Sequence, residues 1–305
     1  MRIFRITKEE SDTLKKRAAT ASVSVASTLC LLKLLASLYT GSLSILSSAI
    51  DSLSDIFGSL IIFIAIRISA RPASTNYRYG YGKSEALSAL VQSGLIAGSG
   101  CFIIYDGVSR FFNPVPIEGT AWGIAVMIVS LIATFILIAY QKYVFIRTKS
   151  QAIKADSAHY VVDILTNISI LLTLVVIKLF DITWFDTLTA LLISCYLLYK
   201  AYTLACEAIS TLLDKELDEK IRKNIENIVT KMPFAKGIHD LRTHDLGGTY
   251  FFEFHLELDG RLTLSQAHNY THEIENKILK RYPNAQIIIH QEPAGINDER
   301  LDNKL

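Results

Sequence analysis

The sequence predicts an α-helical polytopic membrane protein with six transmembrane helices and a C-terminal α+β domain in the cytosol. Half of the 305 residues are hydrophobic, and they gather in long blocks. These blocks reach about 20 residues, the length that crosses a bilayer as a helix. After residue 208 the blocks end and charged residues become dense. We therefore expect two domains, residues 1–208 in the membrane and residues 209–305 in the cytosol.

Six apolar blocks define the expected spans. In the first two blocks, between Ala18 and Ile66, the only charged residues are Lys33, Asp51 and Asp55. The third block has a GxxxG spacing at Gly94 and Gly98, which favours close packing of helices. The spans are expected at 17–39, 42–66, 84–112, 118–144, 152–180 and 183–205.

Basic residues in the short loops predict the orientation, since cytoplasmic loops are enriched in lysine and arginine. The N-terminal tail, the second loop and the fourth loop are rich in them, and the odd loops are poor. Trp122 and Trp184 fall at the outer ends of their spans, where an aromatic belt belongs. We expect a multi-pass protein of the cell inner membrane with both termini in the cytoplasm and no cleaved signal peptide.

Composition also limits the partners. The formal net charge is +2, so no polybasic surface indicates nucleic-acid binding. The four cysteines stand singly with no CxxC pair, which indicates small apolar core residues and implies no disulfide framework.

The cytosolic part is predicted to fold in the order α-β-β-α-β, as a small sheet backed by two helices. Residues 217–233 and 263–283 have helical patterns, the first stopped by Pro233. Residues 237–248, 249–260 and 285–293 have strand patterns. In the second strand, alternation sets the apolar face apart from Glu253, His255 and Glu257. The last dozen residues are expected to fray.

Four polar residues stand inside two of the apolar spans. Asp51 and Asp55 are four residues apart, and so are His159 and Asp163, so each pair shares a helix face. Asp51 lies roughly 14 Å from the outer end of its span, and His159 roughly 11 Å from the inner end of its own, at 1.5 Å per residue. Three carboxylates and one imidazole make a four-ligand site that suits Zn²⁺ and tolerates Cd²⁺, Fe²⁺ or Mn²⁺. The alternatives are a hydrogen-bonded polar cluster and a pure proton relay.

Three neighbouring polar residues receive lesser roles. Asp156 is interpreted as a helix-start residue. Lys33 is given no role beyond snorkelling or pairing, and Asn167, one turn beyond Asp163, is a candidate partner of a ligand.

The chain resembles the cation diffusion facilitator family, close to its zinc and ferrous-iron efflux pumps. The matching pieces, which extend to residue 293, are "YTGSLSILSSAIDSLSDI", "YGYGKSEAL", "KADSAHYVVD", "GIHDLRT", "FHLEL", "QAH" and "IIHQE". The resemblance implies a homodimer that exports divalent cations against protons. It implies a transport site made of Asp51, Asp55, His159 and Asp163, and a ferredoxin-like, metallochaperone-like cytosolic domain.

The same resemblance implies a two-metal site in the cytosolic domain. Its ligands would be His239, His255, His268, His290 and Glu292. Glu292 replaces the aspartate common in the family, which keeps the carboxylate and alters its reach. His244 and His272 match no ligand of the family, and no role is expected for them.

One further family site is missing. Ser74, Tyr77 and Tyr81 stand in the second cytoplasmic loop where relatives carry an aspartate and two histidines. Serine and tyrosine are poor Zn²⁺ ligands near neutral pH, so no metal is expected in this loop. Lys83 and Asp214 remain, and such a pair links the two domains in the family.

The sequence thus predicts proton-coupled efflux of divalent cations by alternating access, with Zn²⁺ the first substrate and Cd²⁺ and Fe²⁺ behind it. His159 is the expected coupling residue, because imidazole must be neutral to bind metal. The cations are substrate and tail ligands, and no prosthetic group is expected. A membrane-bound metal sensor that does not transport is the alternative. An intramembrane metalloenzyme is a weaker one, since no HExxH motif occurs, and we expect no enzyme.

Overall fold

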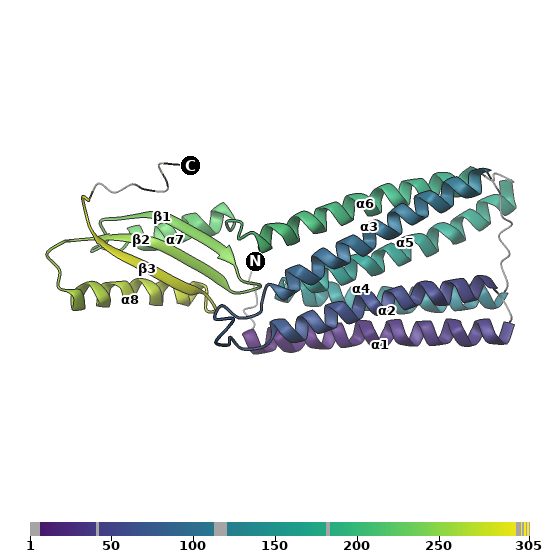
Figure 1. Ribbon diagram of the computed structural model, residues 1–305, viewed down its shortest axis with the longest axis horizontal. Helices are drawn as coiled ribbons and strands as arrows, with labels where there is room; N and C mark the ends of the chain where they lie inside the picture. Colours follow the sequence, from purple (N-terminus) through teal and green to yellow (C-terminus); the bar gives the residue numbers. More distant parts are fainter. Residues whose placement is uncertain are drawn as a thin grey trace. The chain divides into compact units, whose positions relative to one another are not determined.

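The computed structural model describes residues 7–40, 43–112, 121–180, 184–296, 300, 302 and 304 (Figure 1). The chain divides into two compact units, Met1–Ile209 and Ser210–Leu305. The side chains of Trp122 and Trp184 are not among those described, so the expected aromatic belt lies outside the described residues.

The first unit is built from six long helices. They are α1 (Lys8–Thr40), α2 (Leu43–Ser69), α3 (Ser84–Phe112), α4 (Ala121–Thr148), α5 (Gln151–Phe180) and α6 (Trp184–Leu212). Several helices extend beyond the apolar blocks: α1 begins at Lys8 rather than at residue 17, and α6 ends at Leu212 rather than at 205. Polar turns continue these helices past the hydrocarbon, so hydropathy alone underestimates their length.

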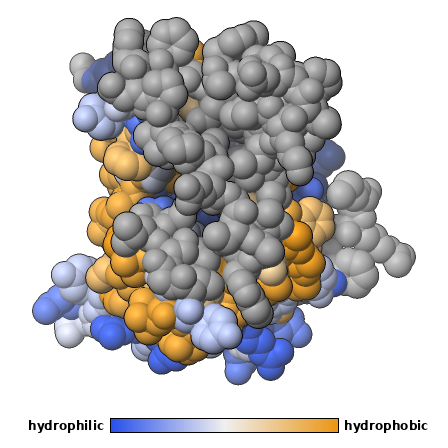
Figure 2. Space-filling model, turned by 90° about the vertical axis from the view of Figure 1, so that its right-hand side faces the viewer, coloured by the Kyte–Doolittle hydropathy of each residue, from blue (hydrophilic) through white to orange (hydrophobic). Residues whose placement is uncertain are grey.

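The helices have the composition of membrane spans. Within the described residues, α1, α2, α3, α4 and α6 are long and apolar enough to cross a bilayer. The remaining helix, α5, carries Lys154, Asp156, His159 and Asp163 in its first half. Large apolar side chains such as Leu38, Phe102 and Phe135 face outward, and hydrophobic residues cover the flanks visible in Figure 2. An apolar exterior is what a lipid environment favours.

Polar residues lie inside this helical unit. Lys15 of α1 and Glu85 of α3 form a buried ion pair with a 2.8 Å separation between Nζ and Oε1. The hydroxyls of Ser69 and Ser150 also donate to the Glu85 carboxylate. A buried ion pair is stable only when its remaining hydrogen-bonding positions are satisfied, and these two serines do this for the Glu85 carboxylate. The contact holds one end of α1 against α3.

Small residues bring α3 close to α6, but at different positions from those expected. A Cβ on Gly107 would lie 3.2 Å from the Cβ of Ala190, and one on Gly100 would lie 3.3 Å from Leu198. A Cβ on Gly94 or Gly98 would meet no described atom within 4 Å. The expected packing role of the Gly94–Gly98 pair was therefore wrong for contacts within the described chain.

The second unit follows the predicted order. It comprises α7 (Glu219–Thr230), β1 (Gly237–Asp245), β2 (Tyr250–Leu258), α8 (Leu264–Arg281) and β3 (Gln286–Pro293). The sheet has the order β1-β2-β3, with β1 and β2 antiparallel and β2 and β3 parallel. A capping box of Thr263 and Gln266 starts α8.

Both helices pack against one face of this sheet. Phe252, Phe254 and Leu256 of β2 are fully buried in one core with Ile225 of α7 and Ile274 of α8. Since neighbouring strand residues point to opposite faces, Glu253, His255 and Glu257 belong to the other face, which these helices do not cover. The predicted alternation of β2 is confirmed, and it places the polar residues of the sheet on its open face.

Candidate metal centres

Residues from two apolar helices meet inside the first unit. Asp55 of α2 lies opposite His159 and Asp163 of α5, and the three offer ligand atoms that all lie within 4.8 Å of one another. The closest pair is His159 Nε2 and Asp55 Oδ1, 3.1 Å apart. His159 is buried, and its Nδ1 has no hydrogen-bond partner among the described residues. Two carboxylates and an imidazole converging at this range form a donor set for a divalent cation.

The fourth predicted ligand lies apart from this group. Asp51 precedes Asp55 by one helical turn, is exposed, and interacts electrostatically with Lys33 of α1. The Lys33 ammonium donates to Ser52 Oγ at 2.7 Å and to the Ser48 carbonyl at 3.4 Å. Lys33 therefore joins α1 to α2 beside Asp51, so of the two expectations for this residue, snorkelling and pairing, the structure shows pairing.

The structure revises the interpretation of Asp156. The interpretation as a helix-start residue was wrong, because α5 begins at Gln151 and has no acidic residue in its first turn. Asp156 is fully buried, one turn before His159. Its carboxylate accepts from Gln141 Nε2 of α4 at 2.8 Å and from Ser59 Oγ of α2 at 3.3 Å. Tyr160 extends this network to α1, because its hydroxyl lies 2.7 Å from Ser59 Oγ and donates to the Ser22 carbonyl.

On both α2 and α5, this hydrogen-bond network lies one helical turn from the candidate metal ligands. Ser59 follows Asp55 by four residues, and Asp156 precedes His159 by three. Hydrogen bonds between helices therefore fix α2 against α5 directly beside the point where Asp55 meets His159. In the sequence, the three-residue spacing from His159 was the one indication that Asp156 lies near the site. Its burial could not be predicted, because it depends on a hydrogen-bond network with residues of three other helices.

We expect Asp156→Ala to destabilise the protein. It would remove one hydrogen bond from Gln141 Nε2, which still donates to Ser22 Oγ, and one from Ser59 Oγ, which still contacts Tyr160 Oη. We expect a cost of about 0.5–1.5 kcal/mol for each hydrogen bond lost. The measurement is the thermal unfolding midpoint in detergent. Ser130→Ala is the matched control, because Ser130 is buried in α4 and its hydroxyl has no partner within the described chain. Equal midpoints for the two variants would contradict the structural role of the network.

The sheet of the second unit gathers a second set of ligands. Strand pairing places His239, His255 and His290 in one row across β1, β2 and β3. The neighbouring row contains Gly237, Glu257 and Glu292. His239 Nε2 lies 3.0 Å from Glu292 Oε1, and His255 Nδ1 lies 3.3 Å from Glu292 Oε2. Register thus brings together four of the five predicted tail ligands, His239, His255, His290 and Glu292.

The fifth predicted tail ligand is not gathered with them. His268 is exposed on α8, where its ring lies 4.5 Å from that of His272. It belongs to none of the groups of potential ligands found among the described residues. His272 contacts Glu275, and His244 stacks on Phe251 and lies 3.7 Å from Asp214. The assignment of His268 as a ligand stays a prediction.

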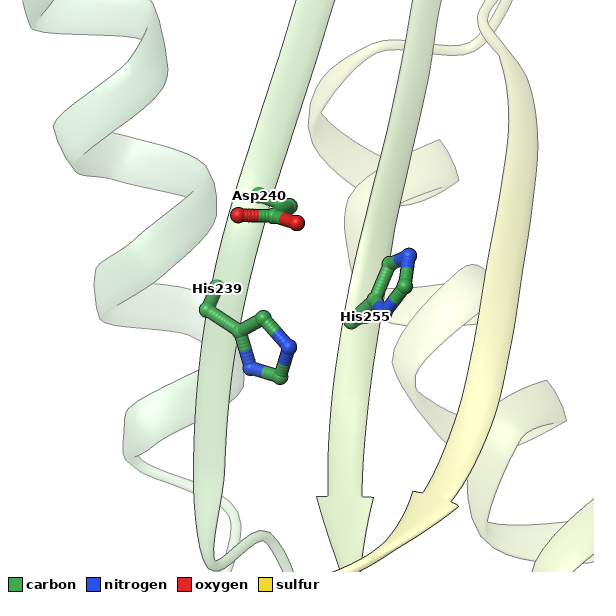
Figure 3. Close-up of side chains that lie close together, drawn as sticks. All are labelled: His239, Asp240 and His255. Carbon is green, nitrogen blue, oxygen red and sulfur yellow. The ribbon is translucent and has the colours of Figure 1, made fainter. Parts of the chain in front are cut away.

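Two acidic residues that were not among the tail ligands predicted from the sequence, Asp240 and Glu257, lie close to them. Asp240 forms a group with His239 and His255, and Figure 3 shows these three side chains on the adjacent strands β1 and β2. Glu257 forms another group with His239 and Glu292. The alternation of β2 already placed Glu257 on the face of His255. Asp240 could not be found this way, because an irregularity in the β1–β2 pairing follows His239.

The loop between α2 and α3 is held by its own side chains. Ser74 Oγ and Tyr81 Oη lie 3.0 Å apart, and the rings of Tyr77 and Tyr81 are 4.8 Å apart. These are the residues that stand in place of the ligands expected from the family. That the loop binds no metal, and that Lys83 and Asp214 link the units, both stay predictions.

Comparison with known families covers nearly the whole chain. The family model described as the cation efflux transmembrane domain matches residues 19–213. The model described as the cation efflux protein, cytoplasmic domain, matches residues 217–294. The two matches together account for both compact units.

Individual relatives agree with the family models. The cation-efflux pump FieF of Escherichia coli O139:H28 is 42% identical over 288 residues, covering 93% of this chain and 94% of FieF. FieF of E. coli K12 matches to the same extent. The solved metal-bound C-terminal domain of CzcD from Thermotoga maritima is 27% identical and aligns with 27% of this chain and all of its own, with a TM-score of 0.26. A solved cytosolic domain of a cation diffusion facilitator protein is 31% identical over 25% of this chain and 93% of its own, with a TM-score of 0.24. With its six-helix membrane unit and its α+β tail, the chain belongs to the cation efflux, or cation diffusion facilitator, family of multi-pass inner-membrane metal pumps.

Proposed function

We propose that this chain exports Zn²⁺ from the cytoplasm in exchange for protons, as a homodimer that works by alternating access. Cd²⁺ and Fe²⁺ would be further substrates. The observation that carries the proposal is the convergence of Asp55, His159 and Asp163 between two helices of an apolar bundle. Ionisable residues at such a depth are costly unless they serve a pathway. The cation is the substrate, so the site binds it transiently.

The donor set supports zinc as the first substrate. Zn²⁺ accepts nitrogen and oxygen ligands in tetrahedral geometry, and Asp51 would supply the fourth ligand. Asp51 precedes Asp55 by one turn on the same helix face, so a small rotation of its side chain or of α2 would bring it toward the group. One imidazole among carboxylates favours Zn²⁺ over Mn²⁺, which prefers oxygen ligands.

Proton exchange follows from the chemistry of the same ligands. Carboxylates and imidazole bind a cation only when deprotonated, so protons and metal compete for one set of atoms. A proton that enters from outside would release the metal there, and its loss to the cytoplasm would restore the site. His159 is the ligand whose side chain type changes charge nearest to neutral pH.

The second unit would bind metal in the cytosol and hold the two protomers together. The support for metal binding is the row of histidines on the open face of the sheet and the partly buried Glu292 beside it. Both termini would lie in the cytoplasm, as the basic loops predict.

Flux separates the proposed exporter from a sensor. The purified chain would be reconstituted in liposomes loaded with a zinc-sensitive dye, with a proton gradient imposed across the bilayer. An exporter gives dye signal that depends on the gradient, whereas a sensor binds Zn²⁺ without flux. Competition among Zn²⁺, Cd²⁺, Fe²⁺ and Mn²⁺ in the same vesicles would rank the substrates.

We expect the tail to bind two metals per protomer and the loop after α2 to bind none. Metal content would be counted by elemental analysis on the full chain with the membrane ligands Asp55 and Asp163 replaced by alanine. His255→Ala and His290→Ala should each lower the count, and Tyr77→Phe should leave it unchanged. An unchanged count in both histidine variants would contradict the tail site, and a lower count in Tyr77→Phe would place metal in the loop.

A further inference from the structure

We propose that Glu257 is a metal ligand of the cytosolic unit and that Arg300, which follows β3 in the chain, pairs with this carboxylate when no metal is bound. The inference rests on the proposed tail site and adds a ligand and a built-in competitor to it. The supporting contacts lie on the open face of the sheet. No role in metal binding was expected from the sequence for Glu257 or Arg300.

Glu257 lies in the most enclosed part of the ligand set. Its side chain is 14% exposed, and those of His239 and Glu292 are 6% and 9% exposed. Glu257 Oε1 is 3.3 Å from His239 Nδ1, and the other ring nitrogen of His239 is 3.0 Å from Glu292 Oε1. His239 therefore stands between two carboxylates, with one ring nitrogen directed to each.

The backbone of β1 is shaped to receive the Glu257 carboxylate. Gly237 is its cross-strand partner, and a Cβ added there would lie 2.9 Å from both Cδ and Oε2 of Glu257. Any larger residue would push the carboxylate away from the strand. Glycine at this position keeps the carboxylate within reach of His239.

The charges of His239, Glu257 and Glu292 favour binding of a cation. His239 Nδ1 is buried and has no hydrogen-bond partner among the described residues, although Glu257 Oε1 is close to it. Two carboxylates with little solvent repel each other, and burying their charge is costly without a positive partner. A divalent cation ligated by His239 Nδ1 and Glu257 would satisfy the free nitrogen and offset the charge of this carboxylate, with Glu292 near enough to join them.

Arg300 supplies positive charge at the same carboxylate. Its Nη2 lies 2.6 Å from Glu257 Oε1, the oxygen that faces His239. A guanidinium carries a permanent positive charge, so a divalent cation bound at this oxygen would repel it at close range. We therefore expect metal binding through Glu257 to favour release of Arg300.

Asp302, two residues after Arg300, also contacts the site. The Asp240 amide donates to Asp302 Oδ2 at 2.8 Å, and the Asp302 amide donates to Asp240 Oδ1 at 3.0 Å. Asp240 has a φ of 51°, in the left-handed region, at the irregularity that follows His239. Asp tolerates this conformation better than most residues, and bulges often redirect side chains beside functional sites. Arg300 and Asp302 thus each contact a candidate ligand, Glu257 and Asp240 respectively.

Competition between Arg300 and metal predicts effects of opposite sign from the two partners of one ion pair. Removing Arg300 removes a competitor and should tighten metal binding, whereas removing Glu257 removes a ligand and should weaken it. If the ion pair served only to stabilise the fold, both changes would act in the same direction.

The test is a Zn²⁺ titration of the full chain in detergent, by calorimetry, in a background with Asp55 and Asp163 replaced by alanine. Arg300→Gln should lower the tail Kd several-fold, and Glu257→Gln should raise it by about tenfold or more, since even partners outside the metal shell contribute that much. Arg261→Gln is the matched control, because Arg261 is 91% exposed and its carboxylate partner is Asp259, which belongs to none of the candidate ligand groups among the described residues. It should leave the Kd unchanged.

A second readout keeps the proposal testable if Glu257→Gln fails to fold. Saturating Zn²⁺ should speed amide exchange in the wild-type peptide that contains residues 300–305, because release of Arg300 frees the Asp302 amide. Shifts of the same sign for Arg300→Gln and Glu257→Gln, or exchange that Zn²⁺ does not alter, would overturn the inference. A background chain that binds no Zn²⁺ would instead overturn the tail site on which the inference rests.

Discussion

Replacing Asp163 by alanine should abolish zinc flux while leaving the protein folded, and Asp55→Ala should do the same. Each change removes a carboxylate from a group whose ligand atoms all lie within 4.8 Å. Loss of a partner outside a metal shell already costs about 10–100-fold, so loss of a ligand should reduce flux by more than about 100-fold. The measurement is initial zinc uptake into dye-loaded proteoliposomes.

Folding must be checked separately, because both aspartates are next to helix contacts. Size-exclusion profiles and unfolding midpoints in detergent should match the wild type, since removing one of two facing carboxylates also relieves repulsion. Glu9→Ala, at an exposed carboxylate in the first turn of α1, is the control and should keep full flux. Wild-type flux in Asp163→Ala would remove the site from the transport pathway.

Local pattern was enough to predict most of the fold. The apolar blocks predicted six helices, because burial in lipid demands long runs of apolar residues. Alternation in β2 predicted which side chains face the helices of the second unit, and Phe252 and Phe254 are fully buried there. The i to i+4 spacings predicted that Asp51 and Asp55 share one face of their helix, and that His159 and Asp163 share one face of theirs. Each of these predictions needs only the geometry of a single helix or strand.

The features that were missed depend on contacts between elements. Asp156 looked like a helix-start residue, because nothing on α5 itself shows that Gln141 and Ser59 from other helices enclose it. Gly94 and Gly98 had the spacing of a packing motif, yet the close approach falls at Gly100 and Gly107, where α6 presents its side chains. Spacing shows which residues share a face, and it cannot show what that face meets.

In the cytosolic sheet, too, the arrangement of the candidate ligands depends on contacts between elements that sequence spacing cannot show. Strand parity predicted the face of His290 and Glu292, but the alignment of His239, His255 and His290 into one row depends on the register of two strand pairs. Glu257 became a candidate only when that register placed it beside Glu292. A shift of one residue would have moved each of these side chains to the helix-covered face.

Replacing His159 by aspartate should keep transport and lower the preference for Zn²⁺ over Mn²⁺. The imidazole is the only nitrogen donor in the membrane group, with Nε2 3.1 Å from Asp55 Oδ1. An aspartate would leave an all-oxygen site, and oxygen donors suit Mn²⁺ whereas imidazole suits Zn²⁺. We expect the ratio of zinc to manganese flux to fall by about tenfold or more, on the scale of effects seen for altered metal surroundings.

In His159→Asp the length of the side chain changes together with the donor atom, so the two effects on flux must be separated. Aspartate is shorter than histidine, so its carboxylate starts farther from Asp55, and zinc flux itself should also fall. His159→Asn is the matched control, since asparagine has the same length as aspartate but offers a neutral oxygen donor. It should lose flux for both Zn²⁺ and Mn²⁺. The pH dependence of flux should change in His159→Asp as well, because a carboxylate and an imidazole exchange protons in different ranges. If His159→Asp kept both the metal preference and the pH profile of the wild type, His159 would be neither the selecting ligand nor the proton carrier, and both roles would move to Asp55 and Asp163.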